Sequence, residues 1–336
     1  MKTLVLASMM NEGAFIVEWV TWYRMLGFTD ILIVTNDCTD RSPALLDALA
    51  AAGWVTHLPH VLPPDAIPLR AKLRRAARHP LVTGADWIFV CDCDEFLVIH
   101  EGEGRITDLL PADAPFLGMA VNWRVFGTSG RAQHESGLVH RQFTRCAWRS
   151  HPASAWVKSI FRRPELFAAL DAHGPQGYKG DALPSERFWV NSDGAGLPNF
   201  TKGGPYQRHT AEGMQAFARA QLNHYMIRSD ENFALKRGTL SPAALKDRYT
   251  DKFYARYNRN EGEDLSALRH AARFDALHAQ AMALPGVRAL HHLCCADYIA
   301  RLAARAGRRP EEDARWRQEI AAATAADRDG DAAPPR

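Results

Sequence analysis

The sequence predicts an α/β protein with a mostly parallel sheet flanked by helices, a mixed sheet in its second half and a helical C-terminal region. Over about the first sixty residues, apolar runs of strand length alternate with amphipathic segments, as in βαβ units. After residue 119 the apolar runs are short and separated by glycines, which favours antiparallel pairing as well. The two patterns together predict one sheet with both kinds of pairing.

The first elements follow directly from the apolar spacing. Residues 3–9 (TLVLASM) form a buried-strand pattern, and Asn11 can cap the helix that follows. Bulky side chains share one face of that helix, which Gly27 ends. These side chains are Phe15, Trp19, Trp22 and Leu26.

The remaining elements are expected from the same signals of periodicity, caps and turn residues. In the first half they are a strand over 31–35, a helix capped by Ser42, a strand over 54–58, a helix over 69–78 and a strand over 86–90. In the second half they are strand-like runs from 119 to 161, a strand from Lys158 to Phe167, long loops over 174–210, a strand over 222–227 and a helix capped by Ser229.

Composition excludes several classes of protein. The 336 residues carry 41 basic and 38 acidic side chains, so the net charge of +3 is too small for a dedicated nucleic-acid binder. No run reaches the roughly 20 apolar residues that span a bilayer, and the N-terminus lacks a signal-peptide pattern, so we expect a cytoplasmic protein. The six cysteines fit buried apolar positions, because Cys91-x-Cys93 lacks a second pair at zinc spacing.

Paired acids follow the strand over 86–90. Alternate residues share a face of a strand, so the carboxylates of Asp92 and Asp94 should converge at the carboxyl end of the sheet, where α/β proteins bind ligands. Carboxylate oxygens suit Mn²⁺ or Mg²⁺, which leave positions open for the oxygens of a diphosphate. The alternative is that the acids merely cap a strand end.

The turn after the first strand has neither Gly-x-Gly-x-x-Gly nor a Walker motif. This argues against a dinucleotide-binding domain and a P-loop enzyme, and the lack of a Gly-rich first turn also disfavours the rival S-adenosylmethionine methyltransferase. The polar segment Asn36–Ser42, after the second strand, can hydrogen-bond a base or a ribose. An ordinary Asx turn is the alternative.

Several segments, in order and spacing, together resemble family 2-like GT-A glycosyltransferases over residues 1–240. The similarity is closest to the bacterial branch with an Asp-x-Asp-Glu-Phe element, related to family 92. The segments are Met10–Glu12 with Glu18–Trp19 and Trp22–Tyr23, Thr35–Ser42, Asp86–Phe96, Trp123-x-x-Phe126-Gly127, Lys158–Pro164, His173, and His224–Tyr225 with Ser229, Phe233 and Lys236–Gly238.

The resemblance implies transfer of a sugar from a nucleotide-sugar donor, usually a UDP-sugar, to a glycan or lipid-linked acceptor with inversion. It assigns Mn²⁺ or Mg²⁺ to Asp92 and Asp94, and the nucleoside to Asn11, Glu12 and Asp37. A metal-bridged diphosphate is a good leaving group, since the cation neutralises the developing charge. A non-catalytic relative that binds nucleotide sugars or glycans is the alternative.

Other site residues are assigned less closely. His173 or His224 could supply a further metal ligand, and Lys158 could neutralise the diphosphate. We take Glu95 and Asp94 as catalytic candidates. Inverting transfer needs a general base, and the spacing does not single out one among Glu95, Glu135, Asp181 and Asp193.

The resemblance also divides the chain. Residues 1–118 are the expected nucleotide-binding half and 119–240 the acceptor half, followed by a helical extension (241–324) and a disordered tail (325–336). The basic run Arg70–Arg78 fits a solvated helix face, or else a patch that meets donor phosphates or anionic lipid at the inner membrane face. Stacking faces for a sugar acceptor are offered by Trp123, Trp148, Trp156 and Trp189.

Overall fold

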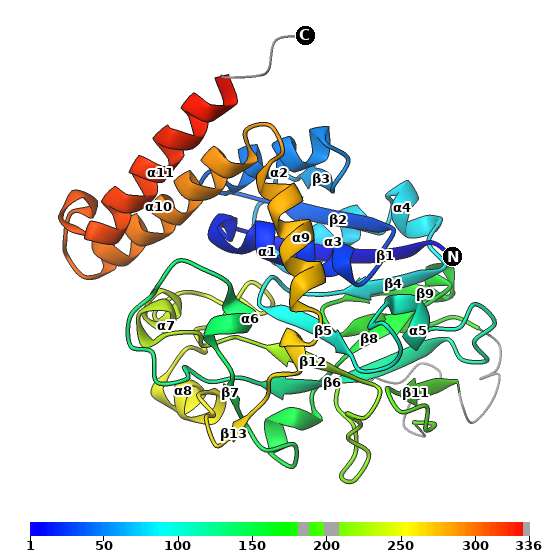
Figure 1. Ribbon diagram of the computed structural model, residues 1–336. Helices are drawn as coiled ribbons and strands as arrows, with labels where there is room; N and C mark the ends of the chain where they lie inside the picture. Colours follow the sequence, from blue (N-terminus) through cyan, green and yellow to red (C-terminus); the bar gives the residue numbers. More distant parts are fainter. Residues whose placement is uncertain (181–187, 198–207, 332–336) are drawn as a thin grey trace.

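The computed structural model describes residues 1–180, 188–197 and 208–331 and shows a central sheet with helices on both faces (Figure 1). The elements of the first part alternate as expected. They are β1 (Thr3–Met9), α1 (Gly13–Met25), β2 (Asp30–Thr35), α2 (Ser42–Ala51), β3 (Thr56–Pro59), α3 (Pro68–Ala76), α4 (Pro80–Thr83), β4 (Trp87–Val90), β5 (Glu95–Ile99) and α5 (Ile106–Leu109).

The second part contains shorter strands and then helices. Its elements up to the last long strand are β6 (Gly118–Val125), α6 (Val139–Gln142), β7 (Arg145–Cys146), β8 (Val157–Phe161), β9 (Phe167–Asp171), β10 (Gly174–Tyr178), β11 (Trp189–Asn191) and β12 (Ala220–His224). The C-terminal elements are α7 (Asp230–Lys236), α8 (Asp251–Tyr257), β13 (Gly262–Glu263), α9 (Ala271–Met282), α10 (Val287–Arg305) and α11 (Ala314–Asp331).

The sheet has the order β3-β2-β1-β4-β8-β6-β12-β5, with β11 pairing with β6. Strands β3, β2, β1 and β4 are parallel, whereas β8 is antiparallel to both β4 and β6. Strand β12 runs parallel to β6 and antiparallel to β5. The carboxyl ends of β1, β2, β4, β6 and β12 therefore lie along one edge, and the expected α/β architecture with a mixed second half and a helical C-terminal region is confirmed.

Each face of the sheet has its own apolar core. Val5 and Phe89 belong to the core that contains α1, α2 and α10, whereas Leu4 and Ile88 belong to the core that contains α3. This follows from the strand period of two, because neighbouring residues point to opposite faces. In Figure 1, α9 and α10 lie on the side of α1 and α2.

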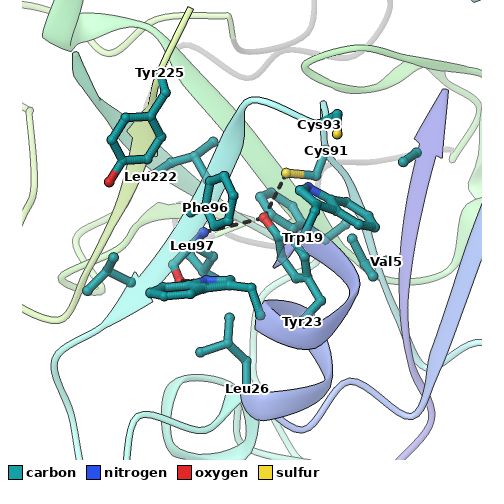
Figure 2. Packing of buried hydrophobic residues seen from close by; sticks show 14 of the residues in the cluster. Val5, Trp19, Tyr23, Leu26, Cys91, Cys93, Phe96, Leu97, Leu222 and Tyr225 are labelled. Atoms are coloured by element: carbon teal, nitrogen blue, oxygen red, sulfur yellow. Dashed lines mark hydrogen bonds between the residues drawn. The ribbon is translucent and has the colours of Figure 1, made fainter. Parts of the chain in front are cut away.

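Helix α1 packs its aromatic face under the strands that carry the acidic residues. Figure 2 shows Trp19 and Tyr23 beside Cys91, Phe96 and Leu97. The Tyr23 hydroxyl lies 2.8 Å from the Cys91 sulfur, and the indole of Trp19 donates to the carbonyl of Asp92 at 3.0 Å. The helix thus fixes the turn between β4 and β5 by polar as well as apolar contacts.

Some local expectations need correction. Asn11 does not cap α1: Glu12 occupies the cap position, and its own side chain makes no capping hydrogen bond. The strand expected from Lys158 to Phe167 is divided, because Arg163 adopts φ 55° before a proline and separates β8 from β9. The loops expected over 174–210 contain β10 and β11 among the described residues.

The helical C-terminal region extends further than expected. Helix α11 continues to Asp331, past residue 324, where the sequence analysis ends the helical extension. None of the helices in the described ranges is both long and apolar enough to cross a membrane. Ser229 caps α7 as expected, since its hydroxyl accepts a hydrogen bond from Asn232 N at 3.2 Å.

A tight contact in the sheet gives a test of the packing. A Cβ atom added at Gly118 would lie 2.2 Å from the Trp189 ring, so Gly118→Ala should lower the free energy of unfolding by about 1–3 kcal/mol. In a Trp189→Ala background the same change should cost little, which urea unfolding of the single and double variants measures. An equal cost in both backgrounds would contradict the contact.

Candidate functional site

Three loops with unusual backbone conformations follow the carboxyl ends of β1, β2 and β12. Asn11, after β1, has φ 58°, Asp37, after β2, has φ 44°, and Arg228, after β12, has φ 58°. Non-glycine residues in the left-handed region are uncommon and tend to gather at ligand sites. The strained positions and the two aspartates after β4 therefore mark one edge of the sheet as the candidate site.

The loops after β1 and β2 are linked by hydrogen bonds. Asn11 Oδ1 accepts from the backbone nitrogens of Thr39 at 2.7 Å and Asp40 at 3.1 Å. Asp37 is exposed beside these bonds, and Asn36 is buried with its amide oxygen unpartnered within the described part of the chain. Asn11 thus orders the loop, whereas the exposed carboxylate of Asp37 is accessible to a ligand.

Asp92 and Lys158 form an ion pair at the end of β4. The ammonium of Lys158 lies 2.7 Å from Asp92 Oδ2 and 2.8 Å from Glu95 Oε2, and the Lys158 side chain is 1% exposed. Burial by itself would lower the pKa of Lys158, but Asp92 and Glu95 outweigh it and raise this pKa. The Asp92 side chain is 40% exposed and can still face a ligand.

Glu95 lies beneath these residues, fully buried. Its Oε2 accepts a hydrogen bond from Asp92 N at 2.9 Å, and its Oε1 has no hydrogen-bond partner in the described residues. Burial raises the pKa of Glu95, with Lys158 acting in the opposite direction. A carboxylate without contact to solvent cannot reach an acceptor hydroxyl, so the geometry favours a positioning role over that of the general base.

Asp94 and His224 lie together. The Nε2 atom of His224 is 3.4 Å from Asp94 Oδ1, and Lys236 Nζ is 3.3 Å from Asp94 Oδ2. Burial would raise the pKa of Asp94, but Lys236, His224 and nearby Arg228 hold it well below its usual value. Asp94 is therefore a carboxylate at neutral pH.

Each ring nitrogen of His224 faces a carboxylate. Nε2 faces Asp94, and Nδ1, which is buried and unpartnered among the described residues, lies 3.7 Å from Glu95 Oε1. A nitrogen lone pair against a carboxylate oxygen is unfavourable, and a cation shared by His224 Nε2 and Asp94 would relieve this contact. The pair, with exposed Asp92 nearby, has the donor chemistry that Mn²⁺ accepts.

His173, the rival metal ligand, lies in an aromatic cluster. Its Nδ1 donates to the carbonyl of Val157 at 2.8 Å, and its ring is 5.6 Å from Trp123 and 5.3 Å from Trp156. Burial lowers the pKa of His173 to about 4, so the ring is neutral. The structure thus brings His224, and not His173, against Asp94, and residues 1–180, 188–197 and 208–331 contain no group of three ligating side chains already assembled.

Further cations lie near Glu12. Arg228 is 5% exposed, stacks 3.5 Å from the centre of the Phe15 ring and lies 3.8 Å from Glu12 Oε2. Burial raises the pKa of Glu12, although Arg228, Lys236 and Arg301 act to lower it. Neither Arg228 nor Arg301 belongs to a motif in the sequence, and only the fold brings them to Glu12.

Lys72 departs from the rest of its basic run. Arg70, Arg74, Arg75 and Arg78 are exposed, whereas Lys72 is 2% exposed and donates to the carbonyl of Met9 at 3.2 Å. The signal was present in the sequence, since Lys72 lies three residues after Leu69 and four before Ala76, on the apolar face of α3. Burial lowers its pKa to about 8, and nearby Cys38, Asp92, Asp37 and Glu12 act in the opposite direction.

The other candidate bases either have partners of their own or lie outside the described residues. Glu135 is paired with Arg131 at 2.7 Å, and Asp193 accepts hydrogen bonds from the backbone of Ala218 and Arg219. Asp181 lies outside the described residues. Trp148 is 60% exposed and Trp156 is half-buried, whereas Trp123 and Trp189 belong to the cores.

Comparisons with solved structures give weak similarities. Residues 1–349 of TarS from S. aureus, in complex with UDP-GlcNAc, share 11% identity over 98% of this chain and 92% of that chain, with a TM-score of 0.34. Glucosyl-3-phosphoglycerate synthase from Mycobacterium tuberculosis, in complex with Mn²⁺, UDP and glucosyl-3-phosphoglycerate, shares 15% identity over 37% of this chain, with a TM-score of 0.27. That match spans 44% of the synthase, less than half its length. No protein-family model and no curated protein matches the chain.

The buried ammonium of Lys72 gives a test by pH. Its pKa is about 8 in the folded protein against 10.5 ordinarily, so the unfolded chain holds this proton up to a higher pH. Stability should therefore rise between these two values, by up to about 3 kcal/mol relative to Lys72→Met. Urea unfolding of both proteins at pH 7.5 and pH 10 measures the difference. If the stabilities of the wild type and Lys72→Met change equally with pH, burial does not lower the pKa of Lys72.

Proposed function

We propose that this protein is a metal-dependent glycosyltransferase that moves a sugar from a nucleotide-sugar donor, a UDP-sugar, to a glycan or lipid-linked acceptor, with inversion. The observation that carries the proposal is the contact of Asp94 with His224, with the partly exposed Asp92 two residues earlier in the chain, at the edge where the loops after β1 and β2 converge. The order of motifs described from the sequence supports the same conclusion.

In this proposal Asp94, His224 and Asp92 hold Mn²⁺ or Mg²⁺. The cation would neutralise charge on the departing diphosphate. Glu95 has a positioning role, because it binds the backbone of Asp92 and faces His224 Nδ1, as carboxylates behind metal-binding histidines do.

The remaining charges at the edge suit an anionic donor. Lys158 neutralises Asp92 and Glu95, while Arg228 and Lys236 lie near Asp94 and Glu12. The buried cations are held by packing and need little reorganisation when a phosphate arrives. Asp37 supplies exposed hydrogen-bond acceptors for the base or the ribose, and Asn11 orders its loop.

The lipid-linked alternative for the acceptor rests on α3. Its exposed arginines, Arg70, Arg74 and Arg75, and Arg78 just beyond the helix form a basic surface that anionic lipid would attract. The glycan alternative rests on Trp156, which is half-buried in the aromatic cluster that also contains His224 and can stack on a sugar ring.

Metal dependence is tested at Asp94, with the opposite end of β4 as a control. We expect UDP to bind at least about tenfold more weakly to Asp94→Asn than to the wild type in Mn²⁺, because one charged ligand is lost. Asp86→Asn, at an exposed position just before β4, should bind as the wild type does. Calorimetry with Mn²⁺ and with EDTA measures this, and equal UDP affinity with and without metal would refute the metal role.

The same variants distinguish an enzyme from a non-catalytic relative that only binds nucleotide sugars. With UDP-sugar and Mn²⁺ the wild type should release UDP slowly to water and faster with a suitable acceptor. Asp94→Asn should reduce this release about a hundredfold while its circular dichroism stays native. A folded wild type that binds UDP-sugar in Mn²⁺ but releases no UDP with any acceptor in a glycan and lipid-linked panel would leave only the binding function.

The nucleoside contact is tested at Asp37. Asp37→Asn keeps a residue that tolerates the left-handed backbone but removes the charge, so UDP affinity should fall about tenfold or more. The free energy of unfolding should change by under about 0.5 kcal/mol, because the side chain is exposed. Asp30→Asn, at the other end of β2, is the matched control. A loss of stability at unchanged affinity would assign Asp37 to the turn alone.

A further inference from the structure

Helix α10 lies across the loops that follow β1 and β2, although 250 residues and more separate them in the chain. Arg301 Nη1 donates to the carbonyl of Asn11 at 3.2 Å. Asp297 Oδ2 accepts from the backbone nitrogen of Arg41 at 3.0 Å, and its other oxygen forms an ion pair with the Arg41 guanidinium. One face of α10 thus contacts both loops.

The same helix fills the space where the two loops meet. A Cβ atom at Gly13 would lie 2.6 Å from the Cys294 sulfur, so α10 approaches the start of α1 closely enough to require glycine there. Gly13 N donates to Asp40 Oδ2 at 3.0 Å, which adds a further link between the loops. Helix α10, the start of α1 and the loop after β2 are therefore packed as one unit.

Helix α10 also reaches the third loop of the site. The Tyr298 hydroxyl accepts from Asn232 Nδ2 at 2.7 Å, and the Tyr298 ring lies 5.1 Å from that of Phe15. Phe15 in turn stacks on Arg228, which follows β12. Three of the positions with left-handed backbone, Asn11, Asp37 and Arg228, lie in loops that α10 contacts directly or through one residue.

Strained backbone persists where its surroundings fix it. The backbone at Asn11 lies between β1 and the hydrogen bond from Arg301, and the loop that contains Asp37 lies between β2 and the contact of Arg41 with Asp297. We propose that α10 supports the donor site and that Arg301 and Asp297 are positioning residues for the nucleoside-binding loops. The inference rests on the proposed function and assigns to the C-terminal helices a role in donor affinity.

The experiment compares Arg301→Ala and Asp297→Ala with Arg305→Ala. Arg305 lies one turn further along α10 and donates to the carbonyl of Arg237, away from both loops. Asp297→Asn keeps a hydrogen-bond acceptor for Arg41 N and is the conservative variant. All are measured by amide hydrogen exchange of residues 36–41 without nucleotide, by the Kd of UDP in Mn²⁺, and by thermal unfolding.

We expect exchange of Thr39 and Asp40 to be about tenfold or more faster in Arg301→Ala and Asp297→Ala, and the Kd of UDP to rise by a similar factor. Asp297→Asn should recover most of both effects. In turnover of a UDP-sugar, KM should rise more than kcat falls, because the loops bind the nucleoside and not the reacting atoms. Arg305→Ala should match the wild type.

Two results would overturn the inference. One is loop exchange and UDP affinity in both alanine variants equal to those of Arg305→Ala. The other is a general loss of stability that Asp297→Asn shares, which would make the contacts structural alone. If the wild type binds no UDP, the proposed function fails, while loop exchange in the same variants still shows whether α10 positions the loops.

Discussion

The buried ammonium of Lys158 is the charge on which the acidic edge of the sheet depends. The Lys158 ammonium lies within 2.8 Å of both Asp92 and Glu95. Its charge stabilises the fully buried carboxylate of Glu95 under the turn between β4 and β5. Removing one partner of such a buried pair typically costs about 3–5 kcal/mol, because the other charge is left uncompensated. Glu95, kept in place in this way, accepts the hydrogen bond from Asp92 N and orders the turn that presents Asp92.

The second charged group is organised differently. Arg228 and Lys236 lie with Glu12 and Asp94 between the loop after β1 and the residues after β12, and the Arg228 guanidinium stacks on Phe15. Here the cations hold Asp94 ionised, while His224 stands between Asp94 and Glu95. The edge thus combines the partly exposed carboxylate of Asp92 with the buried cations Lys158 and Arg228, a combination that would suit the proposed metal-bridged diphosphate.

The sequence indicated this edge because its signals are local. Asp92 and Asp94 follow an apolar strand, and the polar segment after β2 falls where a parallel sheet places its ligand loops. The roles of the individual residues at this edge could not be predicted from such local signals. The spacing does not show that Glu95 is buried, or that His224 rather than His173 lies against Asp94. It also does not show that the amide oxygen of Asn11 accepts hydrogen bonds from Thr39 N and Asp40 N.

By itself the sequence determined the alternation of strands and helices, the two apolar faces of the sheet and the position of the acids, since these depend on residue periodicity and on turn and cap residues. Only the tertiary structure decided which distant side chains complete the site. Lys158 was a candidate from the sequence, but its pairing with Asp92 and Glu95 depends on the pairing of β8 with β4. Arg228 and Arg301 reach the candidate site from the loop after β12 and from α10, through strand pairing and helix packing. Such contacts leave no pattern along the chain, because the energy of a buried charge depends on neighbours that the fold supplies.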